Sequence, residues 1–266
     1  MLPSTKYVEP VERTLDSEFK FRCHKDVGCF NRCCRHTEML LTPYDVLRMK
    51  KRLGLSSGEF LEKYTRTHID EKSLHPFAVL KMMDDEEGNC PFVTAEGCSI
   101  YEDRPANCRY YPVGKGLVIK DSESGGPAPQ EFFFFIREPN CLGYEEDSEW
   151  TIDTWRSEQG VDLYDEMNRE WAEIQLRRDN PGRPQLDPNR QPLIYMASYD
   201  IDRFRRFVYE SGFLNMFDID NEEIEKMKTD DIALMKFGFK YLKYVLMLEE
   251  TLKVKEEYKK EKDTGD

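Results

Sequence analysis

The spacing of apolar residues in the first half of the chain predicts short strands around one helical hairpin. Apolar and polar residues alternate over 15–22, as in a short strand. A mostly apolar run over 77–83 predicts a buried strand, and two further strands are predicted over 116–120 and 131–137. The segment 43–67 has the periodicity of two consecutive helices. These elements indicate an α+β fold.

Local signals mark the ends of the predicted hairpin. Thr42 is suited to be the N-cap of the first helix, with Pro43 in the first helical position. Gly54 is suited to end that helix. Ser56 and Glu59 have the spacing of a capping box and predict the start of the second helix.

Beyond residue 141 the pattern becomes mainly helical. Helices are predicted over 150–159, 161–178, 200–210 and 230–260, with a proline-rich linker over 180–192. The last helix carries an apolar stripe that predicts a packing face, either in the core or against a second copy. The stripe consists of Ile232, Met235, Phe239, Leu242 and Leu246.

The chain is long for one domain, since domains usually have about 100–200 residues, and cysteine is confined to its first 141 residues. We therefore expect a small cysteine-rich metal-binding domain over 1–145, with short strands and the helical hairpin. A mainly helical C-terminal region follows over 146–266. Its helices are the predicted surface for a homo-oligomer or a protein partner.

Charge and hydropathy exclude several classes of function. A net charge of −13 over 266 residues disfavours binding to nucleic acid, which needs a basic surface, and to an anionic membrane. The longest apolar run, 132–136, is far shorter than the about 20 residues of a membrane-spanning helix. No basic segment followed by an apolar one marks a secretory signal. We expect a cytoplasmic protein that binds neither nucleic acid nor a membrane.

The candidate chemistry lies in eight cysteines that form two boxes. The first box contains Cys23, Cys29, Cys33 and Cys34, and the second box contains Cys90, Cys98, Cys108 and Cys141. Disulfides are rare in the cytosol, so metal ligation is favoured over four disulfides or free redox-active thiols. Thiolates bind zinc and iron–sulfur clusters, and eight of them match two four-ligand sites in number.

The spacing within the boxes fits no common motif. Neither box has the Cys-x2-Cys knuckle of zinc fingers or the cysteine run of bacterial ferredoxins. The adjacent Cys33 and Cys34 do not easily close on one metal, because neighbouring side chains of an extended backbone point to opposite faces. One of them could ligate while the other packs or serves a second metal.

Several neighbouring residues extend the set of candidates. Arg22, Lys25 and Arg35 are expected to lower the pKa values of the thiols. His24 and His36 are either additional ligands or histidines that only surround the site. The polar and aromatic residues around the second box are predicted either to bind an anionic group or to form ion pairs with the acidic surface. These residues are Tyr101, Arg104, Arg109, Tyr110 and Tyr111.

Together the two boxes resemble the YkgJ-type cysteine-cluster family, described as zinc- or iron-chelating proteins. The resemblance covers roughly residues 20–141. It rests on Cys29, Cys33 and Cys34, and on Cys90-Pro-Phe, Gly97-Cys98-Ser-Ile-Tyr, Arg104-Pro105 and Cys108-Arg-Tyr-Tyr-Pro112. It implies metal binding without a defined reaction. The flagellin lysine N-methylases carry a similar cysteine pattern, but nothing in 142–266 transfers their activity to this chain.

The sequence therefore predicts a protein that chelates zinc or iron, an iron–sulfur cluster included, through both boxes. One alternative is a metal- or iron–sulfur-dependent enzyme that works by electron transfer or by modifying a protein side chain, as in lysine methylation. Another is a metal-trafficking or interaction module. Catalytic residues are not assigned by the sequence.

Overall fold

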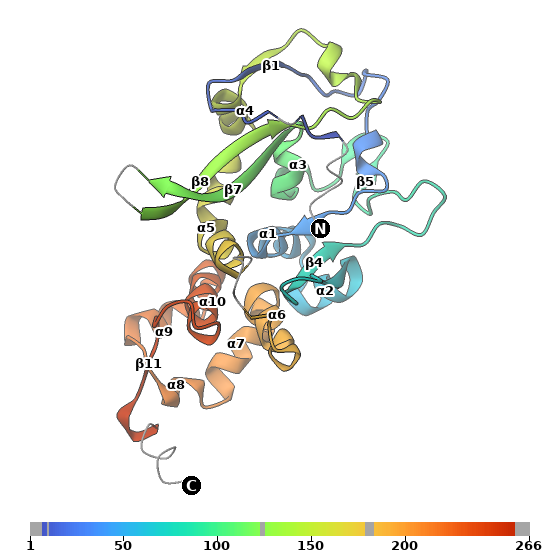
Figure 1. Cartoon of the computed structure of the whole chain (residues 1–266). Helices are drawn as coiled ribbons and strands as arrows, with labels where there is room; N and C mark the ends of the chain where they lie inside the picture. The colour runs from blue at the N-terminus through green and yellow to red at the C-terminus, as the bar shows by residue number, and fades with distance from the viewer. Residues whose placement is uncertain (1–6, 10, 123–125, 179–183, 259–266) are drawn as a thin grey trace.

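A computed structural model describes residues 7–9, 11–122, 126–178 and 184–258 and shows the predicted α+β fold (Figure 1). The first half contains β1 (Glu18–Lys20), β2 (Leu40–Leu41), α1 (Pro43–Leu53), α2 (Ser57–Tyr64), β3 (Thr65–Ile69), β4 (Pro76–Leu80), β5 (Val93–Thr94), β6 (Gly97–Cys98), α3 (Ala106–Tyr110), β7 (Val113–Ser122) and β8 (Gly126–Phe135). The second half contains β9 (Glu149–Thr151), α4 (Ile152–Gln159), α5 (Val161–Arg178), α6 (Gln191–Tyr199), α7 (Ile201–Glu210), α8 (Phe213–Met216), β10 (Phe217–Asp218), α9 (Asn221–Met227), α10 (Asp231–Val245) and β11 (Lys253–Val254). The described residues also include the 3-10 helices η2 (Arg32–Cys34), η3 (Tyr101–Asp103), η4 (Leu142–Glu145) and η5 (Pro188–Arg190).

The strands of the described residues pair in small antiparallel sheets. β4 lies between β2 and β3, while β5 pairs with β6 and β7 with β8. β1 pairs with the distant β9, with Phe19 opposite Trp150. Figure 1 shows β1, β7 and β8 toward one end of the molecule and α7, α8 and α9 toward the other, with α1, α5 and β4 between them. No described helix has the length and apolar character needed to cross a membrane.

The helical hairpin forms as its capping signals predict. Thr42 accepts a hydrogen bond from the Asp45 amide, and the Asp45 carboxylate accepts one from the Thr42 amide. Ser56 and Glu59 form the same reciprocal pair at the start of α2. Gly54 ends α1 with φ +66°, a left-handed conformation that glycine adopts without strain. The hairpin is confirmed, with α2 ending at 64 where β3 begins.

Two hydrophobic clusters hold the fold together. The larger core contains residues from Leu41 to Leu252 and includes most of the α10 stripe, so that stripe is a packing face within one chain. The aromatic core contains Phe19, Phe21, Tyr110, Val113, Phe133, Phe135, Ile152, Trp155 and Val161. In it the Trp155 indole donates to the carbonyl of Tyr110 at 3.0 Å. Both cores combine residues from before and after position 145, and the division into two domains there stays a prediction.

Three predictions from the pattern need correction. The predicted linker over 180–192 contains the start of α6, because Pro192 lies in the first turn, where a helix needs no amide donor. Its residues 180–183 lie outside the described part of the chain. The predicted helix over 230–260 ends at 245, after which Met247 has φ +52° and the chain returns to pair β11 with β10. The strands β7 and β8 extend several residues further into their connection than predicted.

Candidate metal centre

The first box folds as a series of tight turns, since its amides bond to carbonyls three residues earlier. Examples are the Phe30 amide to Val27 at 2.9 Å and the Cys34 amide to Asn31 at 3.0 Å. Asn31 has φ +67°, a left-handed conformation that asparagine tolerates. Asn31 thus permits the tight backbone of the box.

Two distant segments are hydrogen-bonded to this box. On one side the Cys90 amide donates to the Cys34 carbonyl at 2.8 Å, and the His36 amide donates to Gly88 at 2.9 Å. On the other side the Leu142 amide donates to the Cys29 sulfur at 3.2 Å. Both ends of the second box therefore lie beside the first box.

The other cysteines of the second box are positioned by β6 and α3. Cys98 ends the β5–β6 hairpin, which the Ser99 amide closes by donating to Phe92 at 2.8 Å. Cys108 lies on α3, whose first amide, that of Ala106, donates to the buried Asp45 carboxylate at 2.9 Å. The helical hairpin thus fixes the start of the short helix that carries Cys108.

All eight cysteines are free thiols. Burial and then the charges of neighbouring thiols raise the pKa of Cys23 to about 12. A hydrogen bond with Cys34 and then burial raise the pKa of Cys33, and burial is the first cause of the raised pKa of Cys108. The side chains of these three residues are nevertheless exposed over part of their surface. The site is desolvated by surrounding protein, yet ions can reach it from solvent.

Backbone amides support the sulfur atoms of the second box. Hydrogen bonds from the amides of Phe92 and Val93 lower the pKa of the Cys90 thiol, against the larger effect of burial. The backbone amide two residues after Cys98 also lowers the pKa of that thiol, and the amide two residues after Cys141 lowers the pKa of Cys141. In both thiols burial, which raises the pKa, is the larger effect. Such N–H donors favour the thiolate and are typical of metal–thiolate sites. The sequence analysis did not identify them, since they depend on local turns.

The hydroxyl of Tyr111 is a further donor near the site. It donates to a carboxylate oxygen of Glu138 at 3.5 Å and to the Cys141 sulfur, which lowers the pKa of that thiol against the larger effect of burial. Burial and then the contact with Cys141 raise the pKa of Tyr111, so the hydroxyl keeps its proton.

One cation that acts on a thiol was not among those expected to do so. Arg104 lowers the pKa of Cys98 through its charge, after the larger, opposing effect of burial. Arg35 instead forms an ion pair with Glu87 at 3.1 Å. His24 lies 3.2 Å from a carboxylate oxygen of Glu146 and 3.7 Å from one of Asp26. Its ring therefore faces carboxylates.

Arg104 and Arg109 mainly stabilise the loop between Cys98 and Cys108. Arg109 is buried and donates to the backbone carbonyls of Glu102, Arg104 and Gln159. Arg104 donates to the Tyr101 carbonyl, and its guanidinium lies 3.7 Å from the centre of the Tyr101 ring. Tyr110 donates to the Asp165 carboxylate. Backbone carbonyls, and not the acidic surface, are thus the main partners of the two arginines.

The donor side chains have the chemical types of a metal site but are not arranged as one. Within the described residues, no three His, Cys, Asp or Glu side chains are placed so that they could hold a metal ion. The donor set itself fits a thiolate-bound metal, because none of the eight sulfurs is in a disulfide and several accept hydrogen bonds from backbone amides. A cysteine has a single side-chain torsion that moves its sulfur. Closure around a metal therefore requires rotamer changes.

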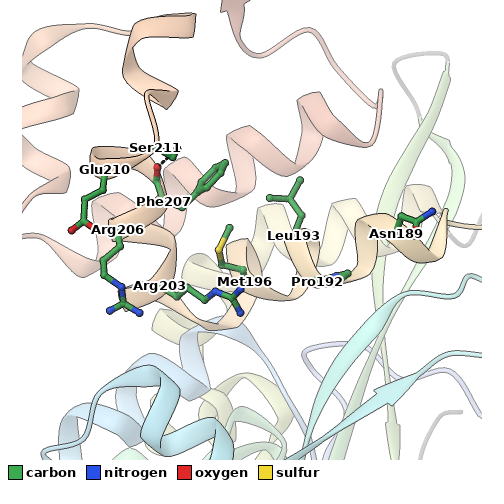
Figure 2. Close-up of a pocket in the computed structure, with 9 residues that line it drawn as sticks. All are labelled: Asn189, Pro192, Leu193, Met196, Arg203, Arg206, Phe207, Glu210 and Ser211. Atoms are coloured by element: carbon green, nitrogen blue, oxygen red, sulfur yellow. Dashed lines mark hydrogen bonds between the residues drawn. The ribbon is translucent and has the colours of Figure 1, made fainter.

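A hollow of about 510 Å³ lies away from the cysteine boxes, between α6 and α7. Figure 2 shows Leu193 and Met196 from α6 and Phe207 from α7 on its walls, with Arg203 and Arg206 near its rim. None of its lining residues is a cysteine. It is therefore not part of the candidate metal centre.

Comparison with known proteins identifies the segment that contains the cysteines. Residues 22–142 match the model of the CxxCxxCC family, whose description is "Putative zinc- or iron-chelating domain". The matched segment begins one residue before Cys23 and ends one residue after Cys141, so it contains all eight cysteines. No curated protein and no solved structure matches the chain.

Proposed function

Because residues 22–142 carry a domain of this cysteine-cluster family, we propose that the chain is a metal-binding protein that holds zinc or iron through both boxes. An iron–sulfur cluster is one form that the iron would take. The proposed ligands are Cys23, Cys29, Cys33, Cys34, Cys90, Cys98, Cys108 and Cys141.

The observation that carries this proposal is the folding of the two boxes against each other. Leu142 and Cys90 are far from the first box in sequence, yet their amides bond to Cys29 and Cys34. All eight cysteines are free of disulfides, which leaves their sulfurs able to bind a metal once they lose their protons. A cytoplasmic location, which belongs to this proposal, would keep them reduced.

A bound zinc or iron would supply a positive charge that favours the thiolate over the thiol. The residues of the chain would provide the rest. Each cysteine would release its proton, the amides and Tyr111 would donate to the sulfurs, and Arg104 would offset negative charge near Cys98. Burial raises the pKa of several of these thiols, so the proposal implies that metal affinity increases with pH.

Metal analysis of the full chain tests the proposal. The protein would be purified without oxygen, and its zinc, iron and acid-labile sulfide would be measured per chain together with its visible spectrum. We expect stoichiometric metal, colourless if zinc and brown if an iron–sulfur cluster. Replacing all eight cysteines with serine should abolish metal binding. The control Met247→Ser should keep the bound metal, because it removes a sulfur from a residue that is 75% exposed.

The opposite result is clear-cut. A purified chain that contains neither zinc nor iron, and that takes up neither Zn²⁺ nor Fe²⁺ after reduction, would refute the proposal. The enzymatic and trafficking alternatives stay predictions, and no contact described above favours one of them.

A further inference from the structure

We propose that the eight cysteines form two separate metal centres of four thiolates each, divided between the adjacent residues Cys33 and Cys34. This inference rests on the proposed function and deepens it. The first centre contains Cys23, Cys29, Cys33 and Cys141, and the second centre contains Cys34, Cys90, Cys98 and Cys108.

At the division the adjacent side chains of Cys33 and Cys34 are in contact through a hydrogen bond, while the backbone on either side of them lies beside different segments. Cys33 and Cys34 lie on the 3-10 helix η2, in which successive residues are rotated by about 120°. Beyond the division the chain runs beside the start of the second box. The Cys34 carbonyl accepts the Cys90 amide at 2.8 Å, and Arg35 forms a β-bridge with Asn89. These contacts place Cys34 next to Cys90.

Before the division the chain runs beside the end of the second box. The Cys29 sulfur accepts the amide of Leu142, the residue after Cys141, at 3.2 Å. The Arg22 amide, next to Cys23, donates to the Gly143 carbonyl at 3.0 Å. Cys23 and Cys29 are therefore held next to Cys141, on a different segment from Cys90.

The apolar surroundings divide in the same way. Cys90 and Cys98 pack against the larger core, whereas Cys141 packs against the aromatic core. The two ends of the second box are thus fixed to different parts of the fold. This arrangement opposes their convergence on one metal.

The mutual influence of the thiols supports the assignment. The thiol charges that act on Cys23, after burial, are those of Cys33, Cys29 and Cys141, which are the other three members of the first centre. Those that act on Cys108, again after burial, include Cys90 and Cys98 of the second centre. Cys33 influences both groups, as expected for the residue beside the division.

Coordination chemistry also favours two centres. Zinc in structural sites has four ligands, and the common iron–sulfur clusters are held by four cysteines. Eight thiolates exceed what one such centre uses. Four ligands on each side of the division match either metal, so the inference does not depend on which one is bound.

Double substitutions in the full-length protein test the division. Metal per chain would be measured for Cys23→Ser/Cys141→Ser and Cys90→Ser/Cys98→Ser, which each affect one centre, and for Cys23→Ser/Cys98→Ser, which affects both. Cobalt(II) titration would provide a second measure, since its absorption reports thiolate ligation. We expect each of the first two variants to keep about half of the wild-type metal and the third to keep less than about a tenth. Met247→Ser is the control.

The single variants Cys33→Ser and Cys34→Ser locate the division. Each should lose half of the metal, and adding Cys141→Ser should remove the other half only from Cys34→Ser. The inference is overturned if a double variant within one centre loses all metal, or if Cys23→Ser/Cys98→Ser keeps half. Two pairs, one in each centre, give independent tests should one variant fail to fold. A wild-type chain with a single four-thiolate centre would overturn the inference and leave the proposed function intact. A wild-type chain without metal would overturn both.

Discussion

Removing the Tyr111 hydroxyl should weaken metal binding without disturbing the fold. Tyr111→Phe deletes one oxygen, the donor to the Cys141 sulfur, and keeps the ring that packs 6.0 Å from Phe21. A hydrogen bond to a charged group contributes about 1.5–3 kcal/mol. Cys141 is half-buried, so the lower value applies, which corresponds to about a tenfold loss of affinity at about 1.4 kcal/mol per factor of ten.

The assay is a competition titration of Zn²⁺ against a chromophoric chelator at several pH values. Losing the donor removes a contact that lowers the pKa of Cys141, so the pH of half-saturation should rise in the variant. Tyr101→Phe is a matched control, because that side chain is 54% exposed and lies in the same segment. Equal zinc affinity in Tyr111→Phe and the wild type, or an equal loss in Tyr101→Phe, would refute the reasoning.

Two further predictions concern the stability of the fold. Burial lowers the pKa of His75 from 6.5 to about 4, so between these pH values the unfolded chain binds one proton more than the folded protein. Stability should therefore fall as the pH drops from 6.5 to 4, by up to about 3 kcal/mol. Urea unfolding midpoints at several pH values would show a weaker pH dependence for His75→Gln than for the wild type, and identical profiles for the two proteins would contradict this. In Gly238→Ala the new Cβ would lie 2.6 Å from the Ala197 carbonyl oxygen, and we expect a loss of about 1–3 kcal/mol. In Gly58→Ala the new Cβ would have no atom closer than 4.0 Å, so this variant should instead stabilise its helix by about 0.5–1 kcal/mol. A loss of stability of equal size in both glycine variants would show that close packing is not the cause.

Elements with local start and stop signals were predictable from the sequence. The boundaries of α1 follow from Thr42, Pro43 and Gly54, whose effects need no distant contact. The helix α6 was missed because Pro192 was interpreted as part of a linker, although a proline is equally suited to the first turn of a helix. The predicted last helix was too long, since its charged end continues the composition of a helix while the backbone turns back at Met247.

The sequence offers candidate members for the site but not their arrangement. The count and positions of the cysteines predict the donor set, which stays a prediction, and the resemblance to a cysteine-cluster family is confirmed by the match over 22–142. Which cysteines lie together depends on contacts such as Leu142 with Cys29 and Cys90 with Cys34, which join distant segments. The roles of Arg104 and Arg109 were not predictable either, because their carbonyl partners exist only in the folded loop.

The pairing of β1 with β9 has a consequence for synthesis on the ribosome. Phe19 lies opposite Trp150, and Cys141 is 118 positions after Cys23 in the sequence. At about 5–20 residues per second, roughly 6–24 s pass between the addition of these two cysteines to the nascent chain. During that interval the thiols of the first box are available to chaperones, oxidants and competing metals without the partners that would enclose them. Under the proposed function, the length of the chain between the two boxes makes correct metal loading an event that follows translation of the first 150 residues.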